Sequence, residues 1–336
     1  MNYSALLNTL IHRGDLSRED MTELMRAIMT GGLSAAQIAG AIIALRCKGE
    51  TVTELAAAAS VMRELSTKVP LGDVPHLVDT CGTGGDGAHT FNISTAAAFV
   101  AAACGARVAK HGGRSVSSKS GSADVLEALG VNVNLPPERV AQAVREIGVG
   151  FMFAPNHHSA MKHAAPVRRE LGVRTLFNLL GPMTNPAGAP HQVVGVFHRE
   201  LTRLLAGVLR ELGSRHVLVV HAADGLDEIS LAGETWIAEL RDGEIHEYTV
   251  TPERFGFVRC ASDYFNVADV AAAKDRLLLA LSGTTCPEQD IVALNAGAAL
   301  LAADCAASLE EGVEMARAAL ISGAARQKLE ALIAFS

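Results

Sequence analysis

The chain has 336 residues, a net charge of -7, 49% apolar residues and 19% charged residues. This length predicts about two domains, and this composition indicates a globular protein instead of a disordered one. An acidic chain with only 4% aromatic residues argues against a protein that grips a nucleic-acid backbone or stacks bases, so we expect no nucleic-acid partner.

The cysteines and the apolar segments bear on location. The six cysteines are scattered and form no CxxC pair, which favours buried thiols in a reducing compartment over a zinc ribbon or a redox dithiol. The first 20 residues lack a basic segment followed by an apolar run, and the longest apolar runs are shorter than the ~20 residues that span a bilayer. We expect a cytoplasmic protein with no membrane partner.

Residues 1–66 have helical spacing throughout. The segment 17–32 begins with Ser17 and has Asp20 three residues later, which resembles a capping box. Segments 34–49 and 51–66 show similar start and stop signals, and no strand pattern interrupts them. This part of the chain predicts a small helical unit.

From residue 71 the pattern alternates between strand and helix. "HLVDT", "ARVAKHGG", "VNVN" and "GVGFMF" predict strands, with helices from "STAAAFVAAACG", "SGSADVLEALG" and "PPERVAQAVREI" between them. Alternation of this kind is typical of an α/β fold with a largely parallel sheet.

Residues 156–180 are helical again, and "GPMTNPAG" ends them. The segments "HQVVGVF", "HVLVVHA" and "TWIAEL" then predict strands with helices between, and the last 50 residues are helical. We predict a discontinuous helical domain, residues 1–70 and 160–186, on a larger α/β domain, residues 71–159 and 187–336, that has a mostly parallel central sheet.

A glycine-rich loop follows the first predicted strand, in "DTCGTGGDGAHTFNIST" at residues 79–95. Glycines let backbone N–H groups converge on a ligand, and the start of the next helix adds unpaired donors and partial positive charge. The loop therefore favours a bound phosphate over a plain turn. It matches neither Walker A nor G-x-G-x-x-G, so it does not name the ligand by itself.

A second loop, "KHGGRSVSSKSGSAD" at residues 110–124, also follows a strand and combines three cations, five serines and three glycines. This composition suits a polyphosphate, although a solvated surface loop is the plain alternative. A third loop presents Asp227 and Glu228 after the strand "HVLVVHA". Paired carboxylates can hold Mg²⁺ beside substrate phosphates, but such pairs are more often solvated surface.

These three segments and "VRRELGVRTLFNLLGPMTNPA" resemble the anthranilate phosphoribosyltransferases over nearly the whole chain. The resemblance implies transfer of the 5-phosphoribosyl group from phosphoribosyl pyrophosphate (PRPP) to the amine of anthranilate, the second step of tryptophan biosynthesis from chorismate. It also implies Mg²⁺, two ions per monomer, and a homodimer formed through the helical domain.

The resemblance also implies the site residues. Those for PRPP are Gly82, Gly85, Asp86, Thr90, Asn92, Ile93, Ser94, Thr95, Lys110, His111, Gly112, Gly113, Arg114, Ser115, Val116, Ser117, Ser118 and Ser122. Those for Mg²⁺ are Ser94, Asp227 and Glu228, and those for anthranilate are Gly82, His111, Gly113, His158 and Arg168. No residue is assigned as a general acid or base, because an arylamine is already unprotonated at neutral pH. Lys110 and Arg168 are expected to act electrostatically.

One residue departs from the family pattern, because Gly113 stands where the family loop has Asn. This puts one anthranilate contact in doubt. Two alternatives stay open at this point: a nucleoside phosphorylase on the same architecture, and a non-catalytic paralogue that binds nucleic acid. The cluster of His157, His158 and His163 lacks the spacing of a transition-metal site.

Overall fold

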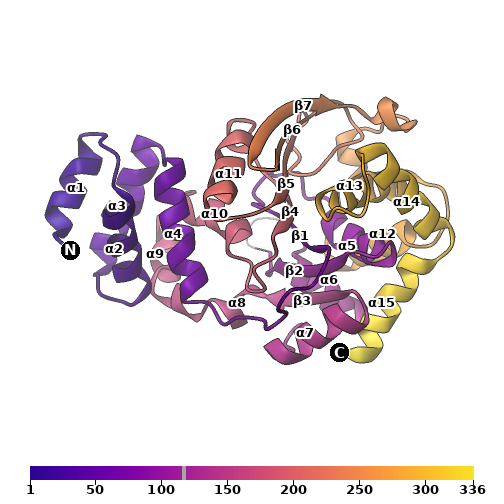
Figure 1. The fold of residues 1–336 in the computed structure, drawn as a ribbon, viewed down its shortest axis with the longest axis horizontal. Helices are drawn as coiled ribbons and strands as arrows, with labels where there is room; N and C mark the ends of the chain where they lie inside the picture. The colour runs from indigo at the N-terminus through magenta and orange to yellow at the C-terminus, as the bar shows by residue number, and fades with distance from the viewer. Residues whose placement is uncertain (116–118) are drawn as a thin grey trace.

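A computed structural model describes residues 1–115 and 119–336. The chain begins with α1 (Tyr3–Ile11), α2 (Arg18–Met29), α3 (Ala35–Lys48) and α4 (Val52–Glu64). These four helices form a bundle at one end of the molecule, at the left of Figure 1. The predicted cap of α2 is confirmed, since the backbone N–H of Asp20 donates to Ser17 Oγ at 3.0 Å.

The predicted α/β fold is confirmed. A sheet has the strand order β3-β2-β1-β4-β5-β6-β7. Its first five members in this order run parallel, and β6 and β7 are antiparallel. The strands are β1 (Leu77–Gly82), β2 (Arg107–Gly112), β3 (Val149–Phe153), β4 (His191–Gly195), β5 (His216–Ala222), β6 (Thr235–Arg241) and β7 (Glu244–Val250).

Helices cover both faces of this sheet (Figure 1). Those that contact its strands are α5 (Ile93–Ala103), α7 (Pro137–Glu146), α11 (Glu200–Glu211), α13 (Pro287–Ala302) and α15 (Ala324–Phe335). Behind them, α12 (Val270–Ala280) and α14 (Leu309–Ile321) pack on α13, and α6 (Ser122–Leu129) packs on α12. Side chains alternate across β5. Val217 and Val219 join the core that contains α11 and the N-terminal bundle, whereas Leu218 and Val220 join the core under α5 and α13. The two faces therefore bury two separate apolar layers.

The segment between β3 and β4 returns to the N-terminal bundle. It contains α8 (Ala154–His157), η1 (Ser159–His163), α9 (Ala165–Leu171), α10 (Leu176–Leu180) and η2 (Gly181–Thr184). Among these, η1 packs on α2, α9 on α3, and α10 and η2 on α4. The two-piece helical domain with boundaries at 70, 160 and 186 stays a prediction, and these contacts support it.

The structure corrects three details of the predicted strands. "VNVN" is not a strand, because residues 131–134 form a turn before α7. A helix lies between β4 and β5, but a loop and not a helix joins β5 to β6. Strand β7 was not predicted, since its side chains are mostly polar and exposed, as an edge strand permits. Within the described residues, no helix is both long and apolar enough to cross a membrane.

Candidate functional site

The predicted loops meet at one edge of the sheet. Strands β1, β2 and β5 point the same way in the sheet, because β1 is parallel to β2 and β4 and β4 is parallel to β5. They end at Gly82, Gly112 and Ala222. The loops that follow them therefore leave the sheet at its carboxyl edge, where open α/β sheets bind their ligands.

The glycine loop needs its glycines. Gly84, Gly85 and Gly87 have φ values of 63°, 77° and 74°, in the region that other residues rarely adopt. At Gly82 the constraint is space, because an added Cβ would lie 2.6 Å from Asp227 Oδ2. The loop therefore lacks side chains for two reasons: three of its glycines have positive φ, and Asp227 approaches its backbone too closely for a Cβ at Gly82.

The acidic loop is bonded directly to this glycine loop. The backbone N–H of Gly84 donates to Asp227 Oδ2 at 2.9 Å, and that of Ser94, in the first turn of α5, donates to Glu228 Oε1 at 3.1 Å. The two carboxylates thus occupy donors that a phosphate would also use. A cation between carboxylates and phosphate would relieve this competition.

Both carboxyl groups titrate well above their ordinary range. Burial raises the pKa of Asp227, and the negative charges of Asp86 and Glu228 raise it further. Burial also raises the pKa of Glu228, to about 7, although the nearby Lys110 ammonium opposes the shift. Adjacent carboxylates that repel each other in a half-buried site favour a bound cation.

These residues fit Mg²⁺ that is shared with a substrate. In the described part of the chain, no three His, Cys, Asp or Glu side chains are grouped so as to hold a metal ion alone. Mg²⁺ usually takes one or two carboxylates and completes its shell with substrate phosphates and water. Two carboxylates beside the Ser94 hydroxyl and the glycine loop match that donor set.

Lys110 lies behind the glycine loop. Its side chain is 3% exposed, and its Nζ donates to the carbonyl oxygen of Thr80 and to Ser94 Oγ, the latter at 3.3 Å. Burial lowers the pKa of Lys110, and the carboxylates of Asp79 and Glu228 oppose this. Lys110 therefore places positive charge under the predicted metal and phosphate position.

The second loop is fastened to the first by side-chain amide and hydroxyl groups. Asn92 Nδ2 donates to the carbonyl oxygen of Ser120 at 3.1 Å, and Ser120 Oγ donates to Asn92 Oδ1 at 3.0 Å. An added Cβ on Gly112 would lie 2.1 Å from Ser122 Oγ, and Ser122 Oγ itself donates to the carbonyl oxygen of Gly113 at 3.4 Å. The two predicted PRPP loops therefore adjoin.

Arg168 is the predicted carboxylate-binding residue, and it has the character for that role. Its guanidinium lies 5.3 Å from the ring centroid of Phe177 and is half-buried, while Arg169 beside it is exposed. In residues 1–115 and 119–336 it forms no ion pair with a carboxylate, and burial lowers its pKa. A half-buried guanidinium of this kind favours an anionic ligand.

His111 and His158 form a neutral aromatic pair. Their ring centroids are 5.0 Å apart, and Nε2 of each is buried without a hydrogen-bond partner. Burial lowers the pKa of both rings, to about 4 for His158. The two neutral rings are therefore suited to border an aromatic ligand and not to act as a cationic site.

The side chains of several residues predicted to bind PRPP are not free to contact it. Arg114 is exposed, and its guanidinium pairs with Asp124 at 3.0 Å and Glu127 at 2.6 Å. Ile93 and Thr95 are each 1% exposed, so the Ile93 side chain belongs to the core and its contribution would come from the backbone. Gly85, Asp86, Thr90 and Ser115 lie on the two loops, and Val116, Ser117 and Ser118 fall outside the described residues. All these assignments stay predictions.

Sequence reasoning missed a buried polar link beneath the site. Asp79 is fully buried in β1, accepts the His111 N–H at 3.1 Å, and accepts Asn185 Nδ2 at 2.7 Å. Asn185 also donates to the carbonyl oxygen of Ala109 at 2.9 Å. This link joins β1, β2 and the end of the segment that carries Arg168. The sequence did contain a signal for this link, because Asp79 is an acidic residue inside the apolar strand "HLVDT".

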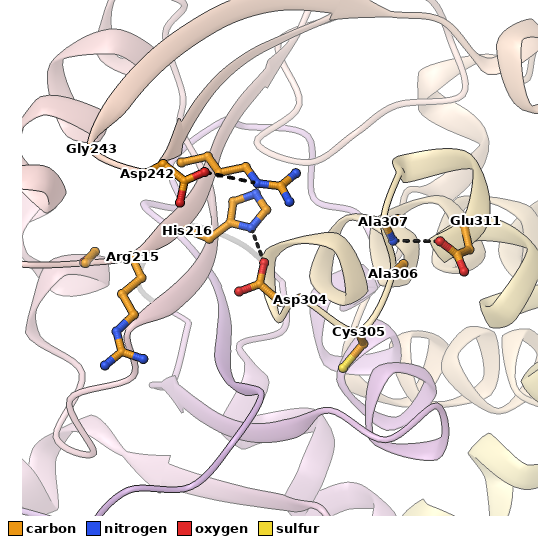
Figure 2. Close-up of a pocket in the computed structure, with 11 residues that line it drawn as sticks. Arg215, His216, Asp242, Gly243, Asp304, Cys305, Ala306, Ala307 and Glu311 are labelled. Carbon is orange, nitrogen blue, oxygen red and sulfur yellow. Dashed lines mark hydrogen bonds and ion pairs between the residues drawn. The ribbon is translucent and has the colours of Figure 1, made fainter.

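A pocket of about 650 Å³ opens at the opposite edge of the sheet, where β5 begins (Figure 2). Its lining includes Arg215, His216 and Asp304. His216 bonds Asp304 and Glu239, both at 2.8 Å, so both ring nitrogens of this histidine are paired within the protein. None of the predicted site residues lines this pocket.

Comparisons with known proteins agree with the fold and the motifs. The model of the glycosyl transferase family a/b domain matches residues 74–326, and that of the family's helical bundle domain matches residues 4–66. The anthranilate phosphoribosyltransferase of Thiobacillus denitrificans is 63% identical over 98% of this chain and 96% of its own length. That of Chromobacterium violaceum is 61% identical over 99% and 97%.

Solved structures give the same result. The crystal structure of anthranilate phosphoribosyltransferase from Thermus thermophilus aligns with a TM-score of 0.93 and 46% identity over 98% of each chain. The Saccharomyces cerevisiae enzyme in complex with PRPP and Mg aligns with a TM-score of 0.89 and 26% identity over 99% of this chain and 97% of that one. Family models, relatives and structures all cover both the bundle and the sheet. The chain therefore belongs to the anthranilate phosphoribosyltransferase family.

Proposed function

We propose that the carboxyl edge of the sheet transfers the 5-phosphoribosyl group of PRPP to the amine of anthranilate. The products are N-(5′-phosphoribosyl)anthranilate and pyrophosphate. The observation that carries this proposal is the bonding of Asp227 and Glu228 to the backbone of Gly84 and Ser94. These bonds place an acidic pair suited to a metal ion against a loop suited to a phosphate. The relatives that share the fold are anthranilate phosphoribosyltransferases, which supports the same function.

The leaving group sets the main demand on the site. As the bond from C1 of the ribose to pyrophosphate breaks, the oxygen takes the electron pair and negative charge grows on the diphosphate. Backbone N–H groups of the glycine loop and of the start of α5 can stabilise that charge. The ammonium of Lys110, which bonds Ser94, adds positive charge beside it. Mg²⁺, when bound at Ser94, Asp227 and Glu228, neutralises part of the diphosphate charge. We place two ions per monomer there.

The nucleophile sets a smaller demand. The arylamine of anthranilate is neutral at pH 7, attacks C1 with its own lone pair, and releases a proton to solvent. Arg168 holds the anthranilate carboxylate, and the neutral rings of His111 and His158 border the aromatic ring. The chain's residues therefore act by positioning and electrostatics, without an assigned general acid or base.

Assembly and location belong to the same proposal. We place a homodimer interface on the N-terminal bundle and the enzyme in the cytoplasm. Size measurement of the purified protein, alone and after substitution of exposed residues of α1, tests the dimer.

One experiment separates this function from its alternatives. Anthranilate fluorescence is followed with PRPP and Mg²⁺, with PRPP and EDTA, and with a nucleoside and inorganic phosphate in a parallel phosphorolysis assay. We expect fluorescence loss with release of one pyrophosphate per anthranilate only in the first mixture. Turnover of the nucleoside instead would identify a phosphorylase. No turnover in any mixture would contradict the proposal that the protein is an enzyme.

A further inference from the structure

Arg174 lies outside every predicted site, between α9 and α10 in the segment that also carries Arg168. It is exposed, and its guanidinium lies 4.3 Å from the ring centroid of Phe197. Phe197 follows Gly195, the last residue of β4. The aromatic ring therefore holds the guanidinium at the carboxyl edge of the sheet.

Arg174 also adjoins the glycine loop. An added Cβ on Gly85 would lie 3.9 Å from both Cζ and Nε of Arg174. The loop is fixed to the end of β4 at the same place, because the N–H of Thr83 donates to the carbonyl oxygen of Gly195 at 2.9 Å. The guanidinium thus faces the part of the loop where backbone N–H groups are free to meet a phosphate.

The charge of Arg174 has no protein partner in the described ranges, where no carboxylate lies within ion-pair distance of it. Some exposed arginines have partners, since Arg26 pairs with Glu64 at 2.7 Å and Arg254 with Glu310 at 2.6 Å, whereas Arg46 and Arg169 have none within the described residues. What distinguishes Arg174 among the exposed arginines is its position on Phe197 and beside Gly85. Stacking on Phe197 uses the face of the guanidinium and leaves its N–H edge for a planar or bidentate anion.

We propose that Arg174 binds the diphosphate of PRPP across the glycine loop and stabilises pyrophosphate as it leaves. This inference rests on the proposed function, and it adds a second cation, beside Gly85, to Lys110, which contacts Ser94. Arg168 and Arg174 lie six residues apart on one segment. That segment would therefore hold the carboxylate of one substrate and the diphosphate of the other, and so set the distance between the amine and C1.

The test compares Arg174→Gln and Arg174→Lys with Arg169→Gln, which removes an exposed arginine from the same segment. Arg174→Gln should raise the KM for PRPP and the inhibition constant of pyrophosphate by roughly ten- to a hundredfold, the loss expected for a charge-assisted contact. The KM for anthranilate should change by less than about twofold, since Arg168 holds that substrate. Arg174→Lys should recover part of the loss, because an ammonium keeps the charge but not the bidentate geometry.

Calorimetric titration of each variant with PRPP and Mg²⁺ gives the same comparison without turnover, and thermal unfolding checks that each variant is folded. If folded Arg174→Gln binds PRPP like Arg169→Gln, or if both KM values rise together, Arg174 does not contact the diphosphate. If instead the wild type binds PRPP but transfers nothing to anthranilate, the proposed function fails while the inference about Arg174 can still be judged from the titration.

Discussion

Two groups of charged residues at opposite edges of the central sheet differ in how they are paired. One surrounds His216 at the amino edge, where β5 begins, and the other is the pair Arg168 and Arg174 at the carboxyl edge, where β5 ends. At the amino edge, His216 is held between Glu239 and Asp304, and Tyr248 donates to the other oxygen of Glu239 at 2.7 Å. At the carboxyl edge, the charged groups of Arg168 and Arg174 have no carboxylate partner within the described ranges. A pocket of about 650 Å³ lies at the amino edge (Figure 2).

This difference shows why the size of a pocket does not locate the site here. Charged groups that neutralise one another within the protein contribute to the fold and leave little binding capacity. Groups that the fold leaves without partners, on loops whose glycines bring backbone N–H groups together, retain that capacity for a ligand. This contrast supports the proposal that the reaction takes place at the carboxyl edge.

The largest expected effect comes from removing the acidic pair. Asp227→Asn with Glu228→Gln should lower kcat by roughly a hundredfold or more, because the leaving diphosphate loses its metal. Steady-state kinetics over a range of Mg²⁺ concentrations measures this. Asp242→Asn, which changes a carboxylate at the amino-edge pocket, is the matched control and should leave kcat unchanged. Near-normal turnover of the double variant at saturating Mg²⁺ would rule out this metal site.

A smaller effect is expected from the carboxylate-binding arginine. Arg168→Ala should raise the KM for anthranilate by roughly ten- to a hundredfold and the KM for PRPP much less, because one charge-assisted contact is lost. The exposed Arg169 provides the control as Arg169→Ala. An equal rise in both constants would assign Arg168 to folding of the segment and not to substrate binding.

Substitution of His216 at the amino edge should change the free energy of unfolding and not the catalytic constants. Burial alone lowers the pKa of His216, but its hydrogen bonds to Glu239 and Asp304 outweigh this and raise it above its ordinary value. A raised folded-state pKa gives stability that is present below the unfolded pKa of about 6.5 and is lost as pH rises through the folded value. Burial lowers the pKa of the neighbouring His191, so its titration falls below that window.

Thermal unfolding of wild type and His216→Gln from pH 6.5 to 9 tests this. The stability advantage of the wild type should shrink by on the order of 1 kcal/mol as pH rises, and the two proteins should share the same KM values. A constant difference across this range would mean that His216 is not a charged link. A changed KM for either substrate would show that His216 at the amino edge also affects substrate binding at the carboxyl edge.

The features that the sequence predicted are those with local signals. The glycine run, the Ser17 cap and the alternating strands each depend on neighbouring residues, and each lies where it was expected except the predicted strand "VNVN". The residues that were missed depend on distant partners. Arg174 is defined by Phe197 and Gly85, and Asp79 by Asn185. No spacing rule connects such residues along the chain. The "VNVN" segment failed because β-branched residues also occur in buried turns, where tertiary packing overrides local propensity.

Gly113 offers the finest test of the carboxyl edge. The position carries Asn in the family pattern, and one neutral hydrogen bond contributes about 0.5–1.5 kcal/mol, so Gly113→Asn should lower the KM for anthranilate by about two- to twelvefold. The structure has room for the change, because an added Cβ on Gly113 meets no heavy atom within 4 Å. Gly113 is also absent from the glycines with positive φ, so an asparagine there is unstrained.

The measurement is steady-state kinetics of wild type and Gly113→Asn at saturating PRPP, with Gly113→Ala as the matched control. Alanine restricts the unfolded chain as asparagine does but supplies no amide, so it separates loop stiffening from hydrogen bonding. If only Asn lowers the KM, the amide contacts anthranilate; if both substitutions lower it equally, loop order accounts for the gain. A KM that is unchanged or higher in Gly113→Asn would place this loop position away from the aromatic substrate and confine its role to the diphosphate.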